Sequence, residues 1–327
     1  MKKIKMIFTG GTIGSTLNAG VIRPDGEKPR ALLEAFREKY HVDFTEFADY
    51  DEPYTILSEH LDGAHLSKLI RAVACAISQG YRGIIITHGT DTLQYTAAAL
   101  GYAFGIGSVP IVLVSSNYPI EDPRANGVEN LYGAVCWLKD SFAGGVWVSY
   151  KNEGAPVQIH RGSRLLAHPQ GSDRVESVSQ NAGFYDAQWK FSFNADYTEK
   201  KDAILPLFPE KELTSPNILW IKPHPGMVYP ALTEGVAGII HETYHSGTLN
   251  LDEAGAFFRQ AQELGIPVFV TGTAPGDIYE SAADFQLYDL RLVPGRSAIS
   301  VYMKLWLTLA CGRNPADTVL PALGGDI

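Results

Sequence analysis

The feature that most restricts the fold of this chain is an alternation of short apolar runs with amphipathic segments in its first half. Four runs rich in Ile and Val and bounded by Gly or Pro have the length of buried strands, at residues 4–8, 83–87, 110–114 and 145–148. Three segments between them have helical spacing, at residues 62–80, 91–104 and 127–139. This order predicts parallel strand–helix–strand units, with helices on both faces of one sheet.

A polar stretch interrupted by prolines, residues 195–215, divides the alternation into two parts. After it we expect strands at 217–221, 236–240 and 267–270 and helices at 251–264 and 297–310. The expected fold class is therefore α/β with two domains. The larger domain, residues 1–194, has a parallel sheet of the flavodoxin or Rossmann type with helices on both faces. A linker at 195–215 joins it to a smaller α/β domain at 216–327.

Length and composition exclude several classes of protein. At 327 residues the chain can bury two hydrophobic cores. Its net charge of -9 argues against a nucleic-acid partner, and no apolar run reaches the ~18 residues of a membrane helix. The three cysteines are far apart and lie in apolar segments, which is typical of reduced thiols. We expect a cytoplasmic protein that binds neither nucleic acid nor a membrane and acts on a small polar molecule.

Two predicted strands end in loops of small and hydroxyl residues, at 9–12 (Thr-Gly-Gly-Thr) and 87–92 (Thr-His-Gly-Thr-Asp-Thr). In open parallel sheets ligands bind beyond the carboxyl ends of the strands, where both loops would lie. Each loop also leads toward a predicted helix, and the exposed amides at a helix start can receive a carboxylate or a developing oxyanion. The loops are therefore candidate parts of a binding or catalytic site.

The glycines around Thr12 allow more than one interpretation. Nucleotide phosphate binding is excluded, because the loop lacks both the G-x-G-x-x-G spacing and a following Gly-Lys-Ser/Thr. A purely structural turn and a mount for a reactive hydroxyl both remain open. The second loop, in which Thr90 precedes the carboxylate of Asp91, favours the reactive hydroxyl.

The two loops, TGGTIGS at 9–15 and ITHGTDTL at 86–93, resemble the signature loops of the bacterial-type L-asparaginases, in the same order and setting. Further stretches are similar to segments of that family, at residues 115–117, 126–131, 243–247 and 267–271. The resemblance extends over most of the chain and is close only at the loops.

This resemblance implies an amidohydrolase that converts L-asparagine to L-aspartate and ammonia through an acyl-threonine intermediate. The implied catalytic residues are Thr12, Thr90 and Asp91, and the implied substrate-binding residues are Gly11, Ser58, Glu59, Gly89, Thr90 and Asp91. No metal or other cofactor is implied. The family also implies a homodimer or homotetramer. For Ser58 and Glu59 an alternative remains open, namely that they only cap a helix.

The chain departs from the family at one position that bears on activation of the nucleophile. The family has a lysine in a segment that corresponds to residues 160–168, HRGSRLLAH, and no lysine is present there. Arg164 can supply positive charge but not act as a base, and Lys151 is the other candidate cation. We therefore expect slow turnover of asparagine. The alternatives are a different ω-amide substrate or a catalytically weak homologue that binds or senses a ligand.

A competing motif is His241-Glu242-Thr243-Tyr244-His245, which matches the H-E-x-x-H pattern of zinc peptidases. That chemistry requires a helix, so that both histidines lie one turn apart on the same face. Here the motif follows the strand-like run 235–240 and precedes Ser246-Gly247, which is typical of a turn. The sequence therefore favours the amidohydrolase over the metallopeptidase.

Overall fold

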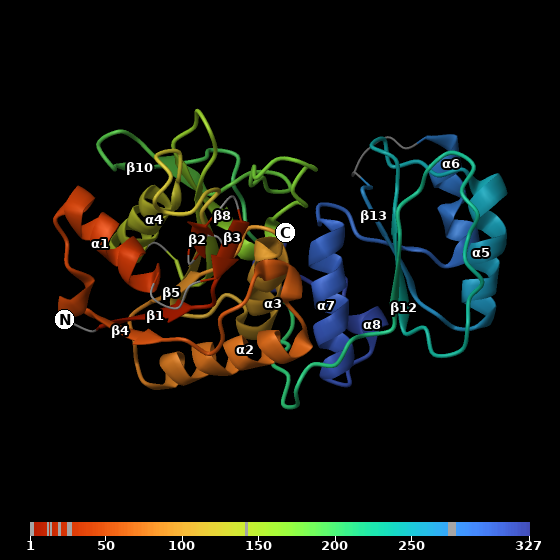
Figure 1. Ribbon diagram of the computed structural model, residues 1–327. Coiled ribbons are helices and arrows are strands. Elements are labelled where there is room, and N and C mark those ends of the chain that lie inside the picture. The colour runs from red at the N-terminus through yellow and green to blue at the C-terminus, as the bar shows by residue number, and fades with distance from the viewer. Residues whose placement is uncertain are drawn as a thin grey trace.

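A computed structural model of the chain, shown in Figure 1, describes residues 3–11, 13, 15–18, 21–24, 28–140, 143–273 and 279–327. Its strands are β1 (Ile4–Phe8), β2 (Ser15–Asn18), β3 (Val21–Pro24), β4 (Ala48–Asp51), β5 (Ile84–Thr87), β6 (Pro110–Val114), β7 (Gly145–Lys151), β8 (Val157–Arg161), β9 (Gly183–Tyr185), β10 (Phe191–Phe193), β11 (Ile218–Ile221), β12 (Gly238–Glu242), β13 (Val268–Thr271) and β14 (Arg291–Leu292). Its α-helices are α1 (Lys28–Tyr40), α2 (Gly63–Ser78), α3 (Leu93–Phe104), α4 (Gly127–Asp140), α5 (Leu251–Glu263), α6 (Glu280–Ala283), α7 (Ala298–Ala310) and α8 (Pro315–Thr318). No helix in these ranges is long and apolar enough to cross a membrane.

The larger sheet has the strand order β10-β9-β8-β7-β6-β5-β1-β4. The five adjacent strands β4, β1, β5, β6 and β7 pair in parallel, which confirms the expected α/β class. Beyond β7 the sheet continues with antiparallel strands that the sequence pattern did not predict. Strand β8 returns antiparallel to β7 because the connection 152–156 is short, and a parallel crossover needs a dozen or more residues.

Helices cover both faces of this sheet, as the alternation predicts. Ile84 and Ile86 of β5 face the core that contains α2 and α3, whereas Ile85 faces the core that contains α1 and α4. Successive side chains of a strand point to opposite faces, so a run that is apolar throughout must be buried on both. The uninterrupted Ile-Ile-Ile of β5 therefore requires the two helical layers.

A second, smaller sheet has the order β11-β12-β13-β14, all parallel. Helix α5 packs against one face of this sheet and α7 against the other. Helix α7 also packs against the core that contains α2 and α3. Met303 and Leu307 belong to that core, whereas Val301 and Leu305 face the second sheet. In Figure 1, α7 accordingly lies between α3 and the second sheet. An almost wholly apolar helix is thus explained by burial from two sides.

Residues 194–217, between the two sheets, contain no helix or strand and lie against the first sheet's helices. Leu207 and Leu213 are buried in the core that contains α2 and α3. The Leu213 amide donates to the Ser67 hydroxyl at 2.8 Å, and the Leu207 amide donates to the Tyr102 carbonyl at 2.8 Å. The segment is therefore anchored to α2 and α3 at these two leucines.

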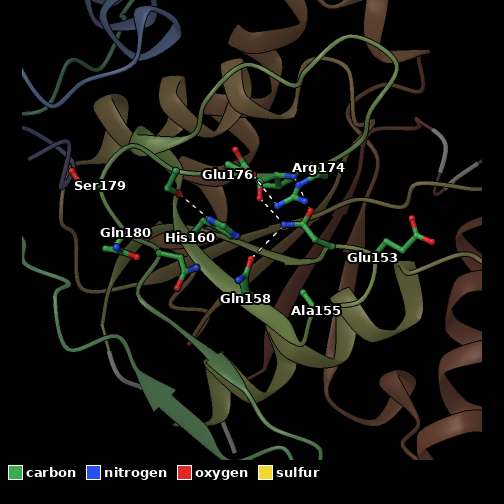
Figure 2. A pocket seen from close by; sticks show the side chains of 12 residues that line it. Glu153, Ala155, Gln158, His160, Arg174, Glu176, Ser179 and Gln180 are labelled. Carbon is green, nitrogen blue, oxygen red and sulfur yellow. Dashed lines mark hydrogen bonds and ion pairs between the residues drawn. The ribbon is translucent and has the colours of Figure 1, made fainter. Parts of the chain in front are cut away.

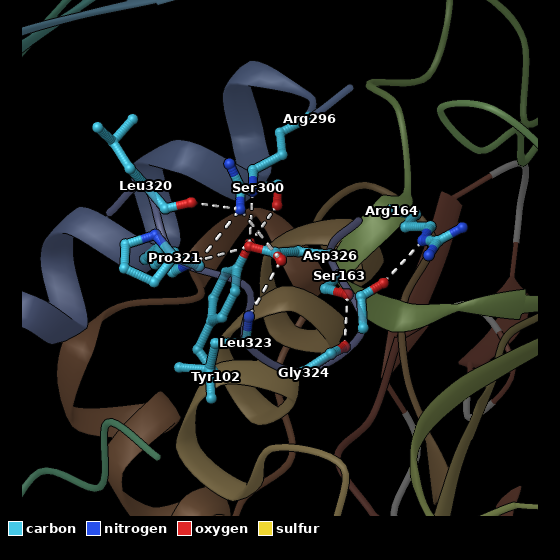
Figure 3. A network of polar contacts seen from close by, with 12 residues as sticks. Tyr102, Ser163, Arg164, Arg296, Ser300, Leu320, Pro321, Leu323, Gly324 and Asp326 are labelled. Carbon is cyan, nitrogen blue, oxygen red and sulfur yellow. Dashed lines mark hydrogen bonds and ion pairs between the residues drawn. The ribbon is translucent and has the colours of Figure 1, made fainter. Parts of the chain in front are cut away.

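The C-terminal tail returns to the first sheet and buries a carboxylate (Figure 3). Asp326 is fully buried, and its Oδ2 lies 2.7 Å from Arg296 Nε and 2.8 Å from Lys304 Nζ. Tyr102 of α3 donates to the same oxygen at 3.3 Å. The tail also accepts a hydrogen bond from Ser163, whose hydroxyl lies 2.7 Å from the Gly324 carbonyl. One buried ionic cluster thus joins α3, α7 and the chain's last residues.

Candidate active site

Two loops leave the larger sheet side by side at the carboxyl ends of β1 and β5. The chain passes from β1 to β4 on one side and then crosses to β5 on the other, so the strand order reverses between β1 and β5. Phe8 lies opposite Thr87, so both loops start at the same level. The Thr9 hydroxyl donates to the Thr87 carbonyl at 2.7 Å. Such a reversal is where open α/β sheets bind ligands.

The two loops and a third segment are in direct contact at Gly11, Gly89 and Ser58. Gly11 has a φ of +77°, and a Cβ on it would lie 2.3 Å from the Gly89 Cα. A Cβ on Gly89 would lie 2.5 Å from the Ser58 Cβ. Both separations are far below van der Waals contact, so only glycine fits at either position. The glycines of the two loops therefore serve to bring three segments together.

Ser58 and Asp91 form the hydrogen-bonded pair at this contact. The Ser58 hydroxyl donates to Asp91 Oδ2 at 3.0 Å, and the Thr92 hydroxyl donates to the Ser58 carbonyl at 2.9 Å. Ser58 is buried, whereas Asp91 and Glu59 are exposed. The capping alternative is wrong for Ser58, because the short helix Ser58–His60 is capped at Leu57 and the Ser58 side chain turns to Asp91 instead.

The predicted nucleophile Thr12 lies outside the described residues. Its neighbours lie at the loop contact, since the Gly11 amide donates to the Ile56 carbonyl at 2.9 Å and Ile13 is buried. Thr90 is half-buried, and its carbonyl accepts a hydrogen bond from the Leu93 amide at 3.3 Å. Of the other predicted site residues, the structure brings together four, namely Gly11, Ser58, Gly89 and Asp91. The exposed side chain of Glu59 takes no part in these contacts.

His88 belongs to the second loop, and its buried side chain is structural. Its Nδ1 lies 2.8 Å from the Gly89 carbonyl and its Nε2 lies 2.8 Å from the Thr96 hydroxyl. Burial lowers the pKa of His88 to about 4, because desolvation disfavours the charged ring. A neutral ring that donates from Nδ1 and accepts at Nε2 satisfies both contacts. The His88 ring therefore holds the Gly89 carbonyl in place by a hydrogen bond.

We predict that acid unfolds this protein through three buried histidines. Burial lowers the pKa values of His88, His160 and His241 to about 4, from 6.5 for an exposed ring. Between these values the unfolded chain binds more protons than the folded one, so stability falls as the pH falls. Each histidine contributes a slope of about 1.4 kcal/mol per pH unit in the free energy of unfolding.

Denaturant titrations between pH 7 and pH 4.5 measure this slope. His160→Gln should reduce it by roughly one titrating group, about 1.4 kcal/mol per pH unit. The exposed His224→Gln is the matched control and should leave the slope unchanged. A free energy of unfolding that stays constant over this interval would contradict the prediction.

His168 is a contact of the site that sequence reasoning did not single out. Its Nε2 lies 2.9 Å from the carbonyl of Thr90, and its Nδ1 lies 2.8 Å from the carbonyl of Arg174. The two residues His168 and Thr90 are 78 positions apart, and no spacing pattern connects them. The tertiary structure, in which residues 162–164 lie against α3, brings this ring to the second loop.

The two cations considered as replacements for a lysine are engaged elsewhere. Arg164 is buried, donating from Nε to the Gly325 carbonyl and from Nη2 to the Thr198 carbonyl, both at 2.7 Å. Lys151 Nζ lies 3.7 Å from Glu129 Oε1. Arg164 therefore holds the C-terminal tail, and Lys151 pairs with α4.

The metallopeptidase hypothesis is wrong, because its motif does not form a helix. His241 and Glu242 end strand β12, and His245 lies in the turn that follows. His241 is buried, with its Nε2 3.0 Å from the Tyr229 hydroxyl. Glu242 accepts from the Trp220 indole at 2.8 Å. These side chains are used in packing around the second sheet.

Among the described residues, two polar pockets lie on either side of Asn152 and Glu153, which follow β7. A pocket of about 290 Å³ lies over β8 and is lined by His160, Arg174 and Glu176 among others (Figure 2). A larger one, about 650 Å³, lies beyond the carboxyl ends of β6 and β7. Both are lined by Asn152, Glu153 and Arg174, and neither contains a predicted site residue.

The fold and the site define an α/β protein with a candidate ligand site where the strand order reverses, between a glycine-rich loop and a Thr-Asp loop. The chain matches the family description "Asparaginase, N-terminal" over residues 3–188, more than half of its length. The chain belongs to the asparaginase family.

Curated relatives carry another name, that of a subunit of glutamyl-tRNA(Gln) amidotransferase. The protein of Sulfurisphaera tokodaii is 27% identical over 98% of this chain and 68% of its own length. That of Metallosphaera sedula is 29% identical over 80% of this chain and 60% of its own length, and that of Saccharolobus solfataricus is 32% identical over 62% and 47%. The chain thus spans about half to two thirds of the length of these relatives.

Solved structures share the fold. The thermostable L-asparaginase from Thermococcus kodakarensis matches with a TM-score of 0.71 and 23% identity, over 96% of this chain and 95% of its own. L-asparaginase I from Vibrio cholerae matches with a TM-score of 0.76 and 20% identity, over 97% of this chain and 95% of its own. The similarity supports the two-sheet architecture over nearly the whole chain.

Proposed function

We propose that this protein is an amidohydrolase that releases ammonia from an ω-amide through an ester on Thr12. The observation that carries the proposal is the Ser58–Asp91 pair at 3.0 Å, held beside the Gly11–Gly89 contact where the strand order reverses. A partly exposed carboxylate, an adjacent hydroxyl and two glycine backbones form a site for an amino-acid head group. Family membership supports the same reaction class.

The proposed reaction has two steps that balance. The Thr12 hydroxyl oxygen attacks the amide carbon, the carbon–nitrogen bond breaks, and the hydroxyl proton leaves with the nitrogen as ammonia. Water then hydrolyses the ester, which releases the carboxylic acid and returns a proton to the Thr12 oxygen. In this proposal Thr90 helps to activate the nucleophile, and Asp91 binds the substrate's α-amino group by a charge-assisted hydrogen bond.

The remaining site residues are assigned to substrate binding. Gly11 and Gly89 let the substrate approach the backbone, because neither presents a side chain to it. Ser58 orients the Asp91 carboxylate through the 3.0 Å hydrogen bond. Glu59 follows Ser58 in the sequence and is exposed. Its proposed role is to contact the part of the substrate that extends toward solvent.

The proposed substrate is L-asparagine or, alternatively, a different ω-amide. The names of the curated relatives describe a subunit of an amidotransferase for glutamyl-tRNA(Gln), which supports an amide other than free asparagine. A ligand-binding protein without turnover is the third alternative. The same names support a protein partner, beside the homodimer or homotetramer and the cytoplasmic location that we expect from sequence.

Ammonia release from a panel of amides tests the proposal. The purified full chain is incubated with asparagine, glutamine and larger ω-amides, and ammonia is measured against a blank without protein. We expect release from at least one amide, with asparagine turned over slowly. Ligand-induced thermal stabilisation without ammonia release from any amide would instead support the sensor alternative.

A further inference from the structure

The ring of His168 lies between two groups that can only accept hydrogen bonds. Its Nε2 is 2.9 Å from the Thr90 carbonyl and its Nδ1 is 2.8 Å from the Arg174 carbonyl. A neutral imidazole carries one N–H, so in that form one nitrogen lone pair would face a carbonyl oxygen. Only the imidazolium form donates both hydrogen bonds.

We propose that His168 is a positively charged positioning residue that ties the Thr90-Asp91 loop to the segment 168–176. It fixes the Thr90 carbonyl and brings a positive charge to the loop that carries Asp91. With both nitrogens donating, the ring holds no lone pair to act as a base, so it acts through Thr90. Its effect on turnover rests on the proposed amidohydrolase function, whereas its protonation and contacts do not.

The Arg174 side of this connection is firmly held. The Val175 amide donates to Asn152 Oδ1 at 2.9 Å, and Asn152 Nδ2 donates to the Val175 carbonyl at 2.8 Å. The Arg174 guanidinium pairs with Glu176 at 3.0 Å beside the pocket in Figure 2. The segment 168–176 is therefore held in place, and the His168 ring connects it to the Thr90-Asp91 loop.

The two segments that His168 connects carry several charged residues. Asp91 lies beside Thr90 in the sequence, and Asp173, Arg174 and Glu176 lie on the supporting segment. Arg174 pairs with Glu176 at 3.0 Å, and the Asp91 carboxylate accepts from the Ser58 hydroxyl. The imidazolium form carries a positive charge and donates both hydrogen bonds, whereas the neutral form donates only one.

Nitrogen-15 NMR of the full chain labelled at histidine tests the protonation directly. At neutral pH we expect both ring nitrogens of His168 at the shifts of protonated nitrogens, with the signal assigned by its loss in His168→Gln. The same variant should speed hydrogen exchange at the Leu93 amide, which donates to the Thr90 carbonyl. A single protonated nitrogen at His168 would overturn the proposal.

Kinetics on the best amide test the positioning role. Glutamine is uncharged, so His168→Gln should lower kcat about tenfold with KM changed less than about twofold. His168→Lys keeps the charge and several donors and should restore most of the rate. Wild-type kcat should fall over the pH interval in which the His168 signals change, and neither variant should show that fall.

The exposed His224, whose Nδ1 also lies near a carbonyl, supplies the matched control as His224→Gln. A wild-type kcat and pH profile in His168→Gln would overturn the positioning role. If the wild type releases ammonia from no amide, the proposed function fails. The NMR shifts and the Leu93 exchange rate then still decide whether His168 holds the loop.

Discussion

Replacing Thr12 with alanine is expected to lower kcat/KM for amide hydrolysis by about a thousandfold or more. The alanine lacks the oxygen that would form the ester, so the covalent route is closed. The rest of the site remains, because Gly11, Gly89, Ser58 and Asp91 are held by contacts with one another. Substrate affinity should therefore change much less than turnover.

Steady-state ammonia release, with substrate binding measured separately by calorimetry, distinguishes the two effects. Thr12→Ser keeps a hydroxyl and should retain measurable turnover. Thr55→Ala removes an exposed hydroxyl that bonds to Glu52 and should behave as the wild type. Turnover in Thr12→Ala within tenfold of the wild type would remove Thr12 from the reaction and, with it, the acyl-threonine route.

Asp326→Asn is expected to lower the free energy of unfolding by about 3–5 kcal/mol. Asparagine has the same shape as aspartate but no charge, so Arg296 and Lys304 would be left buried beside a neutral amide. Burial already lowers the pKa of Lys304 to about 8 despite the opposing charge of Asp326. The melting temperature should fall by roughly 10 °C, because the cluster joins α3, α7 and the tail.

Thermal melts and guanidinium titrations at pH 7 measure this loss. Asp317→Asn is the matched control, since Asp317 is exposed and should change stability by less than about 0.5 kcal/mol. Adding Lys304→Met to Asp326→Asn removes one of the two stranded charges and should recover part of the loss. A melting temperature of Asp326→Asn equal to that of the Asp317→Asn control would contradict the ion cluster as a source of stability.

Much of the fold follows from local pattern, and particular elements show why. Ile84–Thr87 is short, apolar and bounded by glycine, which is enough to identify a strand buried on both faces. Asp62 and Ser297 cap α2 and α7, and each directly precedes an apolar periodic segment. The pattern does not identify the hairpin β2–β3 or the strands β8 to β10, because strands of three to five residues carry little periodic signal.

The candidate site was predictable only where its residues are close in the sequence. Gly11, Gly89, Thr90 and Asp91 lie in two compact loops whose composition identifies them. Ser58 carries no comparable signal. Only the hydrogen bond from its hydroxyl to Asp91, 33 residues away, distinguishes a residue of the site from a helix cap. His168 is still more distant, and a lone histidine beside leucines and alanine predicts no contact with any loop.

The sequence by itself determined the alternation of strands and helices, the two glycine- and hydroxyl-rich loops and the family. These depend on short-range properties, namely side-chain periodicity, backbone freedom and the order of residues within a loop. The tertiary structure alone decided that Ser58 meets Asp91, that Arg164 and Lys151 are engaged elsewhere and that His168 reaches Thr90. Such contacts depend on where the chain crosses itself, because a hydrogen bond needs atoms within about 3 Å and no local pattern specifies that distance.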